Sequence, residues 1–133
     1  MKRIFIDTNA FFRGRERFLK LIEDGYRLVT CTIVVYEFLK VIDELIAEEK
    51  DPRRRKLYIK LKNRFPSLLE DLDIEILSHR ISAQEIREAL MIMEEKSVDI
   101  GDALIYLLLK REKIREILTY DDDWKRLNIE VTQ

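Results

Sequence analysis

Residues 4–12 read IFIDTNAFF, in which apolar residues precede and follow the polar group Asp7, Thr8 and Asn9. A short apolar run bounded by polar residues is typical of a strand buried on both faces of a parallel sheet. Asp7 would then end such a strand, at the edge where open α/β sheets bind their ligands. An aspartate in this place also suits the N-cap of a following helix. The stretch alone leaves both interpretations open.

Outside this stretch, strand and helix patterns alternate. Short apolar runs predict strands at 3–6, 27–31, 74–77, 116–120 and 129–132. Helical periodicity predicts helices at 15–24, 33–49, 53–65, 83–95 and 100–112, with one helical turn at 123–127. This alternation indicates an α/β domain over residues 1–133, with a largely parallel sheet and helices on both of its faces.

Four residues mark expected helix ends. Gly25 ends the first predicted helix, and Thr32 caps the second. Ser82 opens the fourth helix in a capping box. Pro66 is expected to interrupt the third helix or to begin another short one, because proline has no backbone N–H.

The composition is typical of a soluble protein. Apolar residues make up 47% of the 133 residues, and the longest apolar run, ALIYLLL at 103–109, is too short to cross a membrane. Cys31 is the only cysteine, which excludes an internal disulfide and the usual cysteine-based zinc sites. The N-terminus shows no signal-peptide pattern, so we expect a cytoplasmic protein.

Acidic residues occupy equivalent places after the predicted strands. Asp7 and Asp121 directly follow strands, Glu37 lies early in the helix after the second strand, and Asp102 lies in the first turn of helix 100–112. The carboxyl ends of parallel strands share one edge, so these carboxylates should converge there. Their repulsion opposes folding unless a cation is present, and carboxylate oxygens are ligands that Mg²⁺ and Mn²⁺ prefer. Taken singly, each also fits a helix cap or a solvated helix border.

The stretches IDTNAF, VVYEFLK, GDALIYLLL and TYDDDW resemble, in this order, the motifs of the PIN-domain ribonucleases, which include toxins of the VapC type. The resemblance spans residues 4–124. It implies a three-layer α/β/α sandwich around a mostly parallel sheet of four to five strands. It also implies Mg²⁺- or Mn²⁺-dependent cleavage of single-stranded RNA by metal-activated water, with an antitoxin protein as a partner if the chain is a toxin.

Carried over residue by residue, the resemblance assigns the catalytic and metal-binding acids as Asp7, Glu37, Asp102 and Asp121, with Asp123 as an auxiliary metal ligand. It assigns Thr8 and Thr119 as supporting hydroxyls, and we expect Asn9 to help fix the turn after the first strand. Trp124 stands where the family motif has phenylalanine. We interpret Asp99 as an N-cap and His79 as a surface residue without a catalytic role.

Other functions stay open on the sequence. Phosphotransfer domains also place acids and Mg²⁺ at a sheet edge, but Asn9 stands where the aspartyl-phosphatase signature needs a second aspartate. Tyr120 and Asp121 stand where a receiver-like domain needs a lysine. The main alternative is a non-catalytic PIN-fold module that binds RNA or a protein. Mg²⁺-dependent cleavage of single-stranded RNA, abolished by EDTA, distinguishes it from the enzyme.

The stretch 51–66, DPRRRKLYIKLKNRFP, carries seven basic residues and one acidic residue, whereas the whole chain has a net charge of −1. On a helix, Lys56, Lys60 and Arg64 share one face, and such a stripe can contact RNA phosphates. An ordinary solvated helix face gives the same pattern. The apolar residues Tyr36, Phe38, Leu57 and Tyr58 exceed what one small core can cover, which favours a homodimer.

Overall fold

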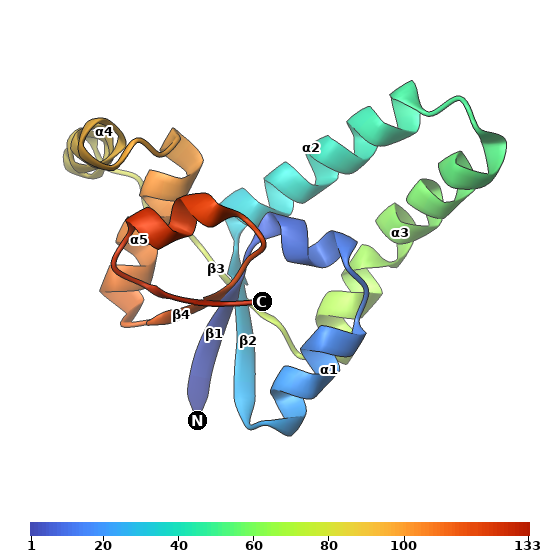
Figure 1. Ribbon diagram of the computed structural model, residues 1–133, viewed down its shortest axis with the longest axis horizontal. Helices are drawn as coiled ribbons and strands as arrows, with labels where there is room; N and C mark the ends of the chain where they lie inside the picture. The colour runs from blue at the N-terminus through green and yellow to red at the C-terminus, as the bar shows by residue number, and fades with distance from the viewer.

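The computed structural model describes residues 1–133 and consists of one parallel sheet between two layers of helices (Figure 1). The strands are β1 (Lys2–Ile6), β2 (Tyr26–Cys31), β3 (Glu75–Leu77), β4 (Glu116–Leu118) and β5 (Glu130–Thr132). The helices are α1 (Glu16–Glu23), α2 (Thr32–Glu48), α3 (Pro52–Asp71), α4 (Ala83–Lys96) and α5 (Ile100–Glu112). Two 3-10 helices, η1 (Thr8–Phe12) and η2 (Asp122–Arg126), follow β1 and β4. The predicted α/β class and parallel sheet are confirmed.

The strand order, β3-β2-β1-β4-β5, places β1 in the middle of the sheet. From β1 the chain moves outward to β2 and β3, and it then returns across the sheet to β4. Because crossovers between parallel strands are right-handed, α1 to α3 and α4 to α5 lie on opposite faces (Figure 1). The order reverses between β1 and β4, and ligands of open α/β sheets bind at such a switch point.

The central strand is buried on both faces, as its apolar run predicts. Ile4, Phe5 and Ile6 have no exposed surface. Backbone pairing continues past the strand end, where the amide of Asp7 donates to the carbonyl of Leu118 at 3.1 Å. This bond aligns the residues that follow β1 with those that follow β4.

Two helix boundaries differ from the sequence prediction. Pro66 lies inside α3, which continues to Asp71. Pro66 is exposed to water, so the Lys62 carbonyl that it deprives of a helical donor can be hydrated, while its neighbour Phe65 anchors α3 in the core. Thr32 is the first residue of α2, and the N-cap is Cys31, whose side chain makes no capping hydrogen bond.

The aromatic residues of the first helices gather into one cluster. Phe38 of α2 stacks on Phe65 of α3 with ring centroids 4.2 Å apart, and Phe11 of η1 meets both rings edge-on. Of the four apolar residues that could not all face one core, Phe38 is fully buried, whereas Tyr36 and Leu57 are exposed. The cluster packs α2 against η1, and both of these elements carry residues of the candidate site described below.

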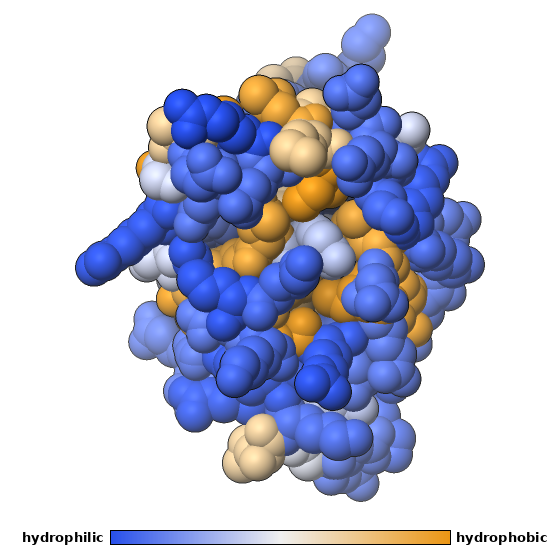
Figure 2. Space-filling view, turned by 90° about the vertical axis from the view of Figure 1, so that its left-hand side faces the viewer, coloured by the Kyte–Doolittle hydropathy of each residue, from blue (hydrophilic) through white to orange (hydrophobic).

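Figure 2 shows the side of the molecule on which α4 and α5 lie, where apolar side chains gather near the centre of the view and hydrophilic side chains surround them. The outer side of α4 exposes Ile86, Leu90 and Met91. None of the helices combines the length and the apolar character needed to cross a membrane.

Candidate metal centre

Asp7 directly follows β1 and also caps η1, so the strand end and the cap of the opening stretch are the same residue. Its Oδ1 accepts a hydrogen bond from the Thr8 amide at 2.8 Å. Its Oδ2 accepts two, from the Thr119 hydroxyl at 2.7 Å and from the Trp124 indole N–H at 3.1 Å. Burial raises the pKa of Asp7, these three donors partly oppose the rise, and the charge of Asp121 adds to it.

Thr119 and Asn9 link the two strand ends at the switch point. The Thr119 hydroxyl donates to Asp7 and accepts from the Asn9 side-chain amide at 3.2 Å and from the Asp121 backbone amide at 3.1 Å. Asn9 Oδ1 also accepts from the Tyr120 amide at 3.0 Å. The hydroxyl of Thr119 therefore uses its donor and both lone pairs, which fixes Asp121 relative to Asp7.

Glu37 projects from the second turn of α2 towards the same edge. Its Oε2 accepts from the Thr8 hydroxyl at 2.9 Å. A Cβ atom at Gly101 of α5 would stand only 2.6 Å from Glu37 Oε1, closer than real contacts allow. Glycine at this position thus leaves the space that the carboxylate occupies. Burial raises the pKa of Glu37, and the charges of Asp7 and Asp99 raise it further.

Asp102 lies in the first turn of α5, whose N-cap is Asp99 as expected. Asp99 Oδ1 accepts from the Asp102 amide at 2.8 Å, but no protein group donates a hydrogen bond to the Asp102 carboxylate. Burial raises the pKa of Asp102 to about 8, and the charges of Asp99, Asp7, Asp121 and Glu37 contribute to the rise. Two features thus mark this carboxyl: crowding by negative charge, and no donor from the protein.

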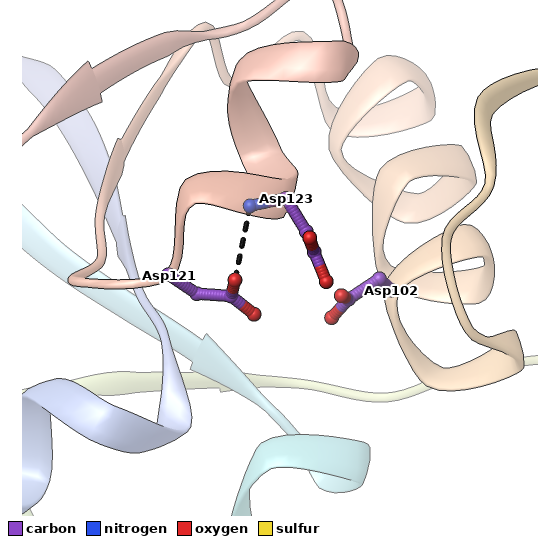
Figure 3. Close-up of side chains that lie close together, drawn as sticks. All are labelled: Asp102, Asp121 and Asp123. Atoms are coloured by element: carbon purple, nitrogen blue, oxygen red, sulfur yellow. Dashed lines mark hydrogen bonds between the residues drawn. The ribbon is translucent and has the colours of Figure 1, made fainter.

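Asp121 and Asp123 extend from the start of η2 towards Asp102 (Figure 3). Asp121 caps η2, because its Oδ1 accepts from the Asp123 amide at 2.9 Å. Asp102, Asp121 and Asp123 each present a carboxylate oxygen within 4.8 Å of the others. Mg²⁺ holds its oxygen ligands about 2.0–2.1 Å away, so oxygens that share one ion lie at most about 4.2 Å apart, and small side-chain movements bring these three carboxylates to that spacing.

A hollow of about 340 Å³ joins these groups. It is lined by Asp7, Thr8, Asn9, Phe12, Glu37, Val41, Asp99, Asp102 and Asp121. The side-chain donors that face it are oxygen atoms, without histidine or cysteine, and this set suits a hard divalent cation rather than zinc. Burial and neighbouring negative charge raise the pKa values of Asp7, Glu37 and Asp102, and a bound cation would oppose both effects.

A family model of the PIN domain matches residues 4–130. The chain belongs to the PIN-domain family. No curated protein matches the sequence. In this PIN domain the acidic hollow lies at the switch point of the parallel sheet, where β1 and β4 end.

Three solved structures share the fold of this PIN domain at low sequence identity. PAE2754 from Pyrobaculum aerophilum has a TM-score of 0.69 at 14% identity, over 98% of this chain and 83% of that one. VapBC2 from Rickettsia felis, bound to a DNA fragment from its promoter, has a TM-score of 0.61 at 17% identity, over 98% and 97%. A toxin–antitoxin complex from Klebsiella pneumoniae has a TM-score of 0.64 at 16% identity, over 98% and 96%.

The acids of this PIN domain lie close together as the sequence predicts, and Asp123 lies nearer to the others than an auxiliary residue need. Asp7, Glu37, Asp102 and Asp121 all line the hollow. Asp123, expected as an auxiliary acid, completes the group of closely spaced carboxylates with Asp102 and Asp121. The metal-binding role of all five stays a prediction.

His79 is partly exposed, and its Nε2 atom is shielded from water without a hydrogen-bond partner. Burial and the charge of Arg111 lower the pKa of His79. Its side chain does not line the acidic hollow, which agrees with its interpretation as non-catalytic.

Sequence reasoning gave no role to Gly101 and treated Trp124 only as a departure from the motif. A glycine within a helix disfavours the helix by up to about 1 kcal/mol relative to alanine, and it often marks a close approach of another group. Trp124 differs from phenylalanine by an indole N–H, and a buried N–H needs an acceptor. Both residues are visible in the sequence, but the sequence does not show that Gly101 faces Glu37 or that Trp124 bonds to Asp7.

Proposed function

We propose that this PIN domain is a metal-dependent endoribonuclease that cleaves single-stranded RNA. Mg²⁺ or Mn²⁺ is the cofactor, and Asp7, Glu37, Asp102, Asp121 and Asp123 are its ligands. The observation that carries the proposal is the convergence of five carboxylates from four segments of the chain at the switch point, three of them with a raised pKa. Helix caps alone do not require that convergence.

A bound divalent ion would neutralise the charge that builds on a phosphate during displacement, and it would lower the pKa of a coordinated water. The residues of the chain prepare the site for it. Thr8 contacts both Asp7 and Glu37, through its amide and its hydroxyl, and so fixes the two carboxylates relative to each other. The carboxylate of Asp102 has no protein donor, so its oxygens are free for the cation.

Cleavage of an unstructured RNA of about 20 nucleotides tests the proposal directly. We expect endonucleolytic products with Mg²⁺ or Mn²⁺, none after EDTA treatment, and recovery of activity when excess metal is returned. Binding of the RNA without cleavage under all these conditions would favour the alternative, a non-catalytic PIN-fold module that binds RNA or protein.

Metal binding can be tested without any substrate. A ligand that binds only the folded state stabilises it, by about 2.7 kcal/mol at a concentration 100 times its dissociation constant. We therefore expect millimolar Mn²⁺ to raise the melting temperature of the metal-free protein. A K⁺ salt at equal ionic strength provides the control, and no shift with Mn²⁺ or Mg²⁺ would contradict the site.

The structural neighbours motivate a toxin role in the cytoplasm with an antitoxin protein as partner, because two of them are toxin–antitoxin assemblies. Co-expression tests it: a toxin should arrest growth alone and not together with its cognate antitoxin. The variant Asp7→Asn, expressed at the same level, controls for toxicity that does not depend on the site.

We also propose a two-fold homodimer. Tyr36 and Leu57 on the pair of helices α2 and α3 are 66% and 64% exposed, which leaves apolar surface for a second copy. Light scattering at tens of micromolar should give twice the mass of the chain. A monomeric mass at that concentration would contradict the dimer and leave the nuclease proposal intact.

A further inference from the structure

Trp124 is the only tryptophan of the chain and is completely buried, with 0% of its surface exposed. Its indole N–H donates to Asp7 Oδ2 at 3.1 Å. Apolar packing would be served by any large ring, so this contact is specific to the indole. It joins the end of β1 to η2, which lie 117 residues apart in the sequence.

The hydrogen bonds of Asp7 show which oxygen is available to a ligand. Each carboxylate oxygen offers two lone-pair positions. At Oδ2 both are occupied, by the Thr119 hydroxyl at 2.7 Å and by the Trp124 indole. At Oδ1 one is occupied, by the Thr8 amide at 2.8 Å. Asp7 therefore has one free position, on Oδ1, and can bind a cation through that atom alone.

The indole is the more rigid of the two donors to Oδ2. The Thr119 hydroxyl can rotate about its C–O bond and also serves as acceptor for Asn9 and Asp121. The Trp124 N–H is fixed by a ring that is enclosed on all sides. Trp124 also directly follows Asp123 in η2, so the contact with Asp7 holds the loop of Asp121 and Asp123 in place.

We infer that Trp124 is a positioning residue of the metal centre. Its indole N–H fixes the Asp7 carboxylate so that Oδ1 faces the hollow. The same hydrogen bond anchors η2 at the distance at which Asp121 and Asp123 share the cation with Asp7. This inference rests on the proposed metal-dependent function. It assigns to the tryptophan a role that packing does not require.

The variant Trp124→Phe tests the role, because phenylalanine fits within the volume of the indole and keeps the apolar contacts but has no donor. We expect a folded protein whose Mn²⁺ dissociation constant, measured by calorimetry, rises about tenfold or more, as is usual when a partner of a metal ligand is removed. The loss of RNA cleavage should be recovered in part at high Mn²⁺. The control Phe18→Leu removes buried aromatic volume from α1 and should lower the melting temperature without changing Mn²⁺ affinity.

The contact itself can be tested without metal or substrate. In the metal-free protein, the single indole N–H resonance should lie downfield and exchange slowly with water. In Asp7→Ala it should move upfield and exchange faster. An unchanged resonance in this variant would overturn the inference, even if the protein binds metal.

The outcomes separate the two proposals. If the wild type binds Mn²⁺ and Trp124→Phe binds it equally well, the positioning role is wrong and the metal site stands. If the wild type binds neither Mn²⁺ nor Mg²⁺, the proposed function is wrong and the positioning role fails with it. Equal losses of Mn²⁺ affinity in Trp124→Phe and Phe18→Leu would also overturn the role, since packing would then explain the effect.

Discussion

The carboxyl edge of the sheet and the hairpin of α2 and α3 both carry many charges of one sign, but the charges at the edge are buried and those on the hairpin are exposed. At the edge, Asp7 and Asp102 are only 5% and 8% exposed and face further acids. On the hairpin, Lys56, Lys60 and Arg64 are exposed to water. Lys62 pairs with Asp43 across the two helices, and both partners of this pair are also exposed.

The difference shows that burial decides whether a cluster of like charges needs a counter-ion. Like charges in a shielded site interact strongly, because little solvent separates them. Exposed charges are screened by water and salt, and exposed ion pairs contribute at most about 1 kcal/mol. The acidic edge therefore calls for a counter-ion, whereas the basic hairpin is stable without a partner.

The largest effect is expected from Asp7→Asn. The amide can accept hydrogen bonds at only one atom and carries no charge, so the proposed metal ligand that follows β1 is lost. Cleavage of RNA should fall by more than about a hundredfold, above the usual loss for partners of ligands, with an unchanged far-UV spectrum. The matched change Asp43→Asn, in an exposed acid of α2, should leave activity unchanged. Full activity of Asp7→Asn would remove Asp7 from the site.

Gly101→Ala should separate activity from stability. The new Cβ would stand 2.6 Å from Glu37 Oε1, and the flexible side chain of Glu37 can move away at little cost to the fold. Alanine favours a helix by up to about 1 kcal/mol over glycine, so the melting temperature should stay constant or rise. Cleavage should nevertheless fall about tenfold or more, because Glu37 is displaced. A parallel loss of stability and activity would indicate general damage to α5.

A smaller effect is expected in the pH dependence of stability. Burial and the neighbouring acids raise the pKa of Asp102 from its ordinary value of 3.8 to about 8, so the folded state binds more protons between these values. In EDTA, the free energy of unfolding should therefore decrease as pH rises from about 4 to about 8. The pKa values of Asp7 and Glu37 are raised as well and act in the same direction.

Urea unfolding of the metal-free wild type and of Asp102→Asn at several pH values measures how much Asp102 contributes to the pH dependence of the free energy of unfolding. The variant lacks the titrating group at the position with the most strongly raised pKa, so its stability should depend less on pH. Identical pH profiles would show that Asp102 does not hold its proton in the folded state.

The sequence predicts which chain segments meet at the edge better than how they are held. Asp7 and Asp121 follow strands that periodicity identifies, and parallel pairing then brings them together. The indole of Trp124 reaches Asp7 across 117 residues, and the space at Gly101 depends on the angle between α2 and α5. Such contacts arise from tertiary packing, which local patterns do not encode. Pro66 illustrates the same point, since burial of Phe65 overrides the local tendency to break α3.

The smallest effect is expected on the basic hairpin. Phe65 stacks on Phe38, which places Arg64 near the level of Glu37. Lys56 lies about 12 Å from Arg64 along α3, at 1.5 Å per residue. We propose that Lys56, Lys60 and Arg64 hold RNA phosphates as the strand leaves the acidic edge, without reading bases.

Replacing these three residues by glutamine should weaken RNA binding for all sequences and reduce its salt dependence, with a slope lower by about 0.7 for each lost contact. Any loss of positive charge weakens binding to RNA. The comparison variant therefore replaces the exposed Lys20, Lys96 and Lys110 by glutamine, which changes the net charge by the same amount as the hairpin variant. Equal slopes for the two triple variants would mean that the overall charge of the protein, and not this stripe, sets RNA affinity. A lower slope for the hairpin variant alone would mean that the basic hairpin, stable without a partner, holds the strand that the acidic edge repels.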